Sequence, residues 1–300
     1  MPGFYDMQDM YRRQAQTGDL TEALETARQL WEAYPDRRNF TWIFLAAAHA
    51  ALGDLHTAAQ VLRQALDAND LWRLSLLDIP ELELVRGDPR CQAVIEEARR
   101  RIEAKGYRPL VVVEQPLHIG IAPLLLHIHG ANGNAASELP HWRGATGLGW
   151  IVAAGQSSQP SAEDSFCWDP PPERTWQDLR AIASMLPTHA RTVLSGFSQG
   201  AWVALQAALR SDIFQPAGVI MVAPFLAGSE RLEPSGRRLR IAMILGDEDP
   251  IVRQPDAVID ALIARGHHVE VVRLAGLGHA YPSDFAERLP VLLASVTRLN

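Results

Sequence analysis

Residues 191–205 read RTVLSGFSQGAWVAL, and this stretch decides the fold. Its first part, up to Ser195, carries β-branched and apolar residues like a buried strand, and its last part has no helix breaker. Between them, the letters GFSQG at 196–200 fit the pattern G-x-S-x-G, which places a serine on a sharp strand-to-helix turn. The two glycines leave room for that turn. The pattern therefore predicts that Ser198 is an exposed nucleophile.

Short apolar runs on both sides of this stretch predict further strands. These runs, with the strand at 192–195, cover residues 110–113, 124–128, 150–154, 192–195, 218–223, 240–245 and 269–274. Helical stretches separate several of them, at residues 175–186, 199–210, 256–265 and 283–298. Continuous apolar runs that alternate with helices are typical of a parallel sheet buried on both faces. We therefore expect an α/β domain over residues 108–300, with its site at the carboxyl ends of the strands.

The first third of the chain has a different composition. Residues 1–107 hold 5 of the 21 glycines and 4 of the 20 prolines. Because helices exclude both residues, this part is predicted to be an all-helical domain that ends near residue 107. The tripeptide Gly18-Asp19-Leu20 recurs at residues 53–55, close to the period of about 34 residues of a tetratricopeptide helix pair. About two such repeats are expected. They are too few to be stable alone, so we expect them to pack on the second domain or on another chain.

A serine hydroxyl needs a base, and an acid must orient that base. Downstream of Ser198, the glycine-rich loop after the last strand carries His279, which is the candidate base. The other two downstream histidines, at 267 and 268, are interpreted as partly exposed turn residues. Three carboxylates, at 247–249, follow the strand at 240–245. We favour Asp249 because Pro250 and the apolar residues after it anchor the turn, with Asp247 as the alternative.

The negative oxygen of a tetrahedral intermediate requires backbone N–H donors. One is expected from Gln199, directly after the nucleophile, and the other from the loop after the strand at 124–128. In that loop, Ala131 is the expected donor and Asn132 its competitor. Asn132 and Trp168 are also candidate substrate contacts. His127 and His129 are assigned to packing, because no third metal ligand lies at a recognisable spacing. No metal and no cofactor are expected.

Composition limits the partners. The 300 residues carry a net charge of −7, which disfavours a nucleic-acid or anionic-membrane binder. The start shows no apolar segment of a signal peptide, and no apolar run reaches the ~18 residues that a membrane helix needs. The two cysteines, Cys91 and Cys167, cannot form a disulfide framework. These features predict a cytoplasmic protein.

Taken together, four motifs resemble the α/β-hydrolase superfamily, and within it the phospholipase/carboxylesterase family. The motifs are His129-Gly130 after a strand, Gly196-Phe197-Ser198-Gln199-Gly200, Gly246-x-x-Asp249-Pro250-Ile251-Val252, and Gly278-His279. The resemblance covers residues ~108–300. It implies that Asp249 is the acid of a Ser198–His279–Asp249 triad and that Ala131 and Gln199 form the oxyanion hole.

The function expected from these residues is a serine carboxylesterase acting on small-molecule esters with short to medium acyl groups. A thioesterase or peptidase with the same triad is one alternative. A repeat-based adaptor with an inactive hydrolase domain is another. The helical domain is expected to mediate assembly into a homo-oligomer or to bind a protein partner.

Overall fold

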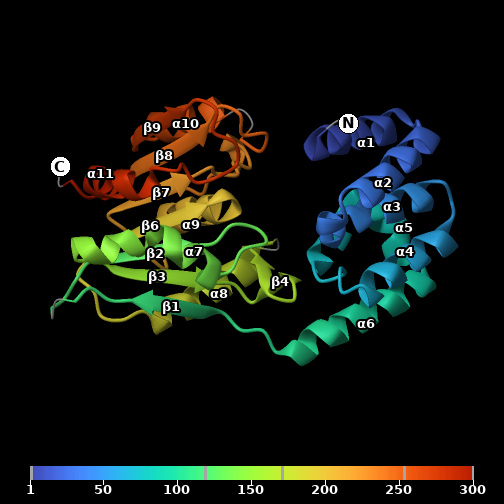
Figure 1. The fold of residues 1–300 in the computed structure, drawn as a ribbon, viewed down its shortest axis with the longest axis horizontal. Coiled ribbons are helices and arrows are strands. Elements are labelled where there is room, and N and C mark those ends of the chain that lie inside the picture. The colour runs from blue at the N-terminus through green and yellow to red at the C-terminus, as the bar shows by residue number, and fades with distance from the viewer. Residues whose placement is uncertain (1–2, 118–119, 170–171, 253–254, 299–300) are drawn as a thin grey trace. The chain divides into compact units, whose positions relative to one another are not determined.

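A computed structural model describes residues 3–117, 120–169, 172–252 and 255–298. The chain forms two compact units. Unit 1 comprises Met1–Tyr107 together with Gln159–Asp164, and unit 2 comprises Arg108–Ser158 and Ser165–Asn300 (Figure 1). The short segment Gln159–Asp164 is thus part of unit 1 although it lies far along the chain, which the sequence did not indicate.

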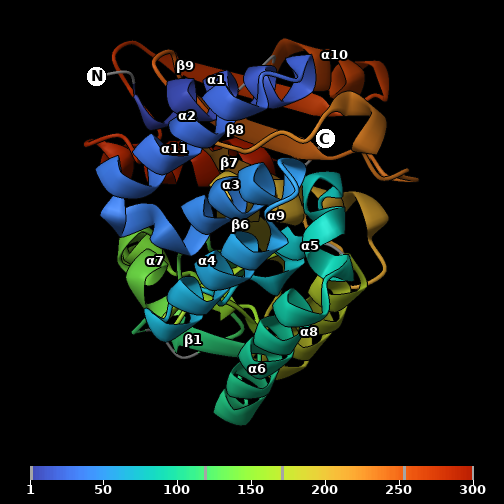
Figure 2. The ribbon, with the colours of Figure 1, turned by 90° about the vertical axis from the view of Figure 1, so that its right-hand side faces the viewer.

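Unit 1 is built from helices, as predicted. They are α1 (Phe4–Thr17), α2 (Leu20–Ala33), α3 (Arg38–Ala51), α4 (Leu55–Asp67), α5 (Glu83–Gly87) and α6 (Pro89–Lys105). Each of the first four packs on the next along the chain (Figure 2). Gly18 and Gly53 follow α1 and α3 with φ of 85° and 81°, a conformation that glycine adopts without strain. The recurring tripeptide therefore marks two equivalent turns between paired helices.

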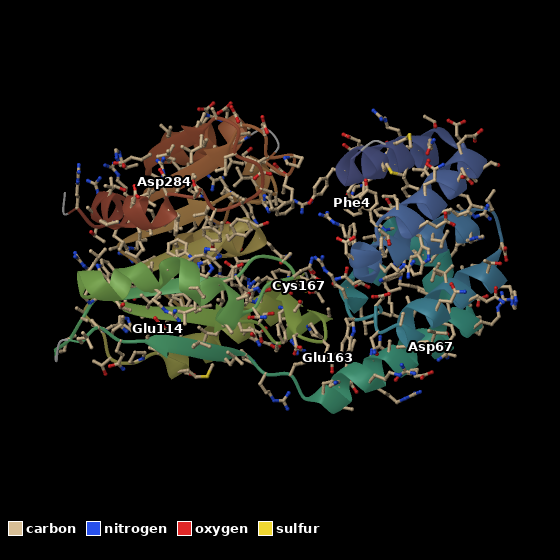
Figure 3. The ribbon with its side chains drawn as sticks, in the orientation of Figure 1. Phe4, Asp67, Glu114, Glu163, Cys167 and Asp284 are labelled. Carbon is tan, nitrogen blue, oxygen red and sulfur yellow. The ribbon has the colours of Figure 1, made fainter. Side chains whose placement is uncertain are left out.

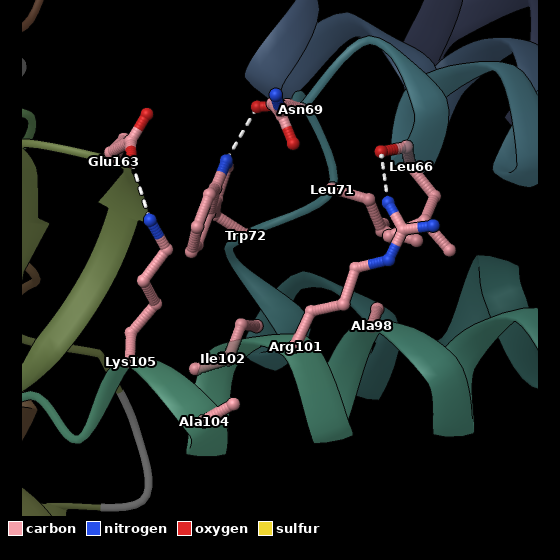
Figure 4. A pocket seen from close by; sticks show the side chains of 10 residues that line it. All are labelled: Leu66, Asn69, Leu71, Trp72, Ala98, Arg101, Ile102, Ala104, Lys105 and Glu163. Atoms are coloured by element: carbon pink, nitrogen blue, oxygen red, sulfur yellow. Dashed lines mark hydrogen bonds and ion pairs between the residues drawn. The ribbon is translucent and has the colours of Figure 1, made fainter.

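The segment Gln159–Asp164 is tied to unit 1 by hydrogen bonds. The Tyr107 hydroxyl donates to the Glu163 carbonyl at 2.8 Å, and the Asn39 amide donates to the Ser161 carbonyl at 3.3 Å. Lys105 pairs with the Glu163 carboxylate beside a cavity of about 340 Å³ in this unit. Trp72 forms one wall of this cavity (Figure 4).

Unit 2 is organised around a seven-stranded sheet in the order β1-β3-β2-β6-β7-β8-β9. Its strands are β1 (Leu110–Glu114), β2 (Leu124–Ile128), β3 (Ile151–Gln156), β6 (Thr192–Phe197), β7 (Gly218–Val222), β8 (Arg240–Gly246) and β9 (His268–Leu274). All neighbours are parallel except β1, which pairs with β3 in the antiparallel sense. The predicted mostly parallel sheet is confirmed. A second sheet has two short strands that were not predicted: β4 (Gln159–Ala162), which belongs to unit 1, and β5 (Ser165–Cys167).

Helices cover both faces of the large sheet. They are α7 (Ala135–Trp142), α8 (Pro172–Met185), α9 (Ser198–Arg210), α10 (Pro255–Ala264) and α11 (Phe285–Thr297). One core layer joins α8, α9 and α10 to the sheet, and the other joins α7 and α11 to its opposite face. Along β8, Met243 lies in the first layer and Ile244 in the second. Because successive side chains enter different cores, the strand is apolar from Ile241 to Leu245.

None of the helices within the described ranges is both long and apolar enough to cross a membrane.

Candidate active site

Ser198 lies on a sharp turn between β6 and α9. Its φ is 51°, a left-handed conformation that is strained for a residue with a side chain. A Cβ on Gly196 would lie 2.3 Å from the backbone of Gly200, and a Cβ on Gly200 would lie 2.1 Å from the Ile128 carbonyl oxygen. Both positions therefore require glycine, which is the physical reason for the G-x-S-x-G spacing.

His279, in the loop after β9, contacts Ser198, and Asp249, in the loop after β8, contacts His279. His279 Nε2 lies 2.9 Å from Ser198 Oγ, and His279 Nδ1 lies 2.8 Å from Asp249 Oδ2. The Asp249 side chain is fully buried, and its second oxygen accepts the Ile251 N–H at 2.9 Å. The Asp249 carboxylate accepts a hydrogen bond from Nδ1–H, so Nε2 is left as an acceptor that faces the serine hydroxyl.

The competing carboxylate, Asp247, has a different position. It is exposed, and its Oδ1 accepts the Gly276 N–H at 2.7 Å. Asp247 thus closes the glycine-rich loop that precedes His279, but it does not contact the imidazole. His267 is buried rather than partly exposed, and its Nδ1 accepts the Leu239 N–H at 3.1 Å. His268 is exposed beside Glu270.

The loop that follows β2 approaches the serine closely. A Cβ on Gly130 would lie 2.9 Å from the Phe197 ring and 3.4 Å from Ser198 Cβ, so the glycine permits this approach. The Asn132 N–H donates to the Phe166 carbonyl at 2.8 Å, which engages the competing donor. Ala131, which lies between Gly130 and Asn132 in the chain, is exposed. The Gln199 N–H lies in the first turn of α9, where N–H groups have no partner within the helix.

Trp168 contacts the start of the loop that follows β2. It is buried, its indole N–H donates to the His129 carbonyl at 3.0 Å, and its backbone N–H donates to Gln199 Oε1 at 2.9 Å. The Gln199 amide donates in return to the Trp168 carbonyl at 3.1 Å. Trp168 thus links Gln199 to the backbone at the end of β2, a role that the sequence did not suggest. Asn132, the other candidate substrate contact, is exposed with a φ of 63°.

A polar cluster beneath the site was not predicted from the sequence. Glu138 on α7 accepts the Tyr281 hydroxyl at 2.7 Å, and the buried Trp142 indole donates to the same hydroxyl at 3.2 Å. The only sequence signal for this cluster is that Tyr281 lies two residues after His279. His127 Nε2 lies 3.3 Å from Glu138 Oε2, a close polar contact.

Burial determines the charge state of this cluster. It lowers the pKa of His127, and it lowers the pKa of His129 to about 4, so both rings are neutral at pH 7. Burial alone would raise the pKa of Glu138, but His127 and Tyr281 stabilise the carboxylate and the pKa is lowered overall. Burial and the Glu138 charge raise the pKa of Tyr281 well above its usual value. The cluster therefore carries one negative charge, on Glu138.

Cys167 lies at the end of β5 (Figure 3), where it is buried and its Sγ donates to Asp169 Oδ2 at 3.1 Å. Within the described residues, no group of three or more His, Cys, Asp or Glu side chains is arranged to hold a metal ion.

Comparison with known proteins gives one family match, within unit 2. Residues 177–294 match the model of the Phospholipase/Carboxylesterase family. An uncharacterized protein from Bacillus cereus ATCC 10987 has a similar solved structure at 21% identity, covering 98% of this chain and 99% of that chain with a TM-score of 0.54. Esterase PE8 is similar at 20% identity, covering 63% of this chain and 99% of that chain with a TM-score of 0.53. These two likenesses show the fold. No curated protein gives a significant match.

The family match covers the serine, the acid and the histidine, and the first solved structure has a similar fold over nearly the whole length of this chain. The chain therefore joins an all-helical N-terminal region to an α/β domain, of which residues 177–294 match this family.

Proposed function

We propose that this protein is a serine carboxylesterase that hydrolyses small esters through an acyl-enzyme. The observation that carries the proposal is the pair of short contacts at His279, 2.9 Å to Ser198 Oγ and 2.8 Å to Asp249 Oδ2. A nucleophile and a base within hydrogen-bond reach, with a third group that orients the base, are what covalent acyl transfer requires.

In the proposed acylation step, Ser198 Oγ attacks the ester carbonyl carbon while its proton passes to His279 Nε2. The carbonyl electrons move to the oxygen, and the N–H groups of Gln199 and Ala131 stabilise that oxyanion. Asp249 stabilises the imidazolium that forms. His279 then gives its proton to the departing alkoxide, so that the alcohol leaves and the acyl group stays on Ser198.

Deacylation repeats the same steps with water. His279 takes a proton from water, the hydroxide oxygen attacks the acyl carbon, and the same two N–H groups hold the second oxyanion. Collapse of this intermediate breaks the bond to Ser198 Oγ, which recovers its proton from His279. The carboxylic acid is released and the enzyme is restored without any external reductant or oxidant.

The proposal is tested with p-nitrophenyl esters of increasing acyl length. Wild-type protein is expected to turn over the short and medium esters, and Ser198→Ala is expected to lose at least about 1,000-fold in kcat. Ser184→Ala, which changes an exposed serine on α8, is the matched control and should keep full activity. Equal turnover by Ser198→Ala and wild type would overturn the assignment.

The same triad could cleave a thioester or a peptide bond, so a substrate panel with matched acyl groups decides the leaving group. A fluorophosphonate probe tests the adaptor alternative. Labelling at Ser198 supports an enzyme, and failure to label wild-type protein supports a scaffold with an inactive hydrolase domain.

For unit 1, we propose tetratricopeptide-like repeats that mediate self-assembly or bind a protein partner. The two turns at Gly18 and Gly53 support this proposal. We further propose a cytoplasmic location.

A further inference from the structure

We propose that Glu138 is a positioning residue, which clamps the His279 loop and the Gly130–Gly133 loop around the serine. This inference rests on the proposed function, because it assigns Glu138 a role in the same reaction.

The first half of the clamp acts on the histidine. Tyr281 lies two residues after His279, and its hydroxyl donates to Glu138 Oε2 at 2.7 Å. The Tyr281 ring stacks on Phe197 with centroids 4.8 Å apart, and Phe197 in turn lies 5.0 Å from the His279 ring. Phe197 directly precedes Ser198. The Glu138–Tyr281 hydrogen bond therefore sets the position of the loop that carries the base relative to the nucleophile.

The second half acts on the glycine loop. A Cβ on Gly133 would lie 3.2 Å from Glu138 Oε1, so the carboxylate packs directly against this loop. Gly133 N–H donates to the Gly130 carbonyl at 3.1 Å, and Gly130 packs against the Phe197 ring. These contacts close a ring that runs from Glu138 through Gly133, Gly130, Phe197 and Tyr281 back to Glu138.

The clamp is rigid for a physical reason. Only 13% of the Glu138 side chain is exposed, and the Trp142 indole donates to the Tyr281 hydroxyl from the buried side. Any movement of Tyr281 would leave a buried carboxylate and a buried indole N–H without their partner, which is costly. Such a support matters because a shift of about 1 Å between nucleophile and base can cost about 100-fold in rate.

Tyr281→Phe is the first test, since it removes only the hydroxyl and keeps the ring on Phe197. We expect kcat per active site to fall about tenfold or more with little change in KM, because none of the clamp contacts is made to substrate. Active sites are counted by fluorophosphonate titration, so that loss of folded protein does not mimic loss of rate. Glu138→Gln retains an acceptor and is expected to stay within about threefold of wild type, whereas Glu138→Ala is expected to match Tyr281→Phe.

Gln206→Leu is the matched control for buried polar loss. Gln206 is buried on α9 and bonds the backbone of Arg231 and Glu233 in unit 2, away from the clamp. It is expected to lower Tm and leave kcat per titrated site unchanged. Wild-type kcat per site in Tyr281→Phe, or equal kcat in Glu138→Gln and Glu138→Ala, would refute the clamp. If wild-type protein itself neither hydrolyses esters nor labels with the probe, the proposed function fails instead.

Discussion

Replacement of Asp249 by asparagine tests which carboxylate serves the histidine. The amide has the shape of the carboxylate, so the fold is expected to survive. In the wild-type protein, Asp249 Oδ1 accepts the Ile251 N–H and Oδ2 lies 2.8 Å from His279 Nδ1. In Asp249→Asn, the Ile251 N–H holds the amide oxygen in the Oδ1 position, so the amide nitrogen takes the Oδ2 position and faces His279 Nδ1. An amide N–H donates, so Nδ1 must become the acceptor and the imidazole proton moves to Nε2. The ring then presents a proton to Ser198 and cannot take one.

The magnitude follows from the loss of the base in its working tautomer. A wrong tautomer of this kind costs about 10,000-fold in a serine protease. At about 1.4 kcal/mol for each factor of ten, that is about 5.5 kcal/mol of transition-state stabilisation. Both oxygens of Asp249 are engaged and its side chain is fully buried, so the asparagine is held in place. We therefore expect Asp249→Asn to lose about 1,000-fold to 10,000-fold in kcat, as in that protease.

The assay is steady-state hydrolysis of a p-nitrophenyl ester, with Tm measured on the same samples. Asp247→Asn is the matched control. Its oxygen can still accept the Gly276 N–H, and the residue is exposed, so we expect kcat within about twofold of wild type. The reasoning would be refuted if Asp249→Asn kept more than about a tenth of the activity, or if Asp247→Asn fell as far.

Two predictions concern stability. Gly200→Ala would bring a Cβ within 2.1 Å of the Ile128 carbonyl oxygen. We expect urea unfolding to show that the free energy of unfolding falls by more than about 3 kcal/mol. Gly147→Ala, whose Cβ would meet no atom within 4 Å, is the control and should leave that free energy unchanged. His129 has a pKa of about 4 in the folded protein and about 6.5 when unfolded, so the unfolded state takes up the proton first as pH falls. Its contribution to stability is complete above pH 6.5 and decreases by about 3 kcal/mol down to pH 4. The slope of unfolding free energy against pH should be smaller in His129→Gln, and an identical slope in both proteins would contradict the assignment of a neutral buried ring.

The sequence was sufficient for features that depend on neighbouring residues. Apolar runs and turn residues predict the strands of the large sheet, because a strand buried on both faces must be apolar throughout. The turn at Ser198 is partly local, since Gly196 meets the backbone of Gly200, whereas Gly200 meets the backbone of Ile128 on the adjacent strand. Helix α7 was missed. It contains Pro140, which argues against a helix, and its only local signal is the N-cap Asn134, whose side chain accepts the Ser137 N–H.

Only the tertiary structure decided which polar groups meet. Asp247 and Asp249 are two residues apart in one turn, yet one is exposed and the other is buried against His279. Trp168 and the pair Glu138–Tyr281 act through contacts between segments that are distant in the chain; the latter two residues are 143 positions apart. The assignment of Gln159–Asp164 to unit 1 has the same origin. Local patterns specify the elements, whereas the partner of a buried polar group depends on how those elements pack, because burial makes an unpaired group costly.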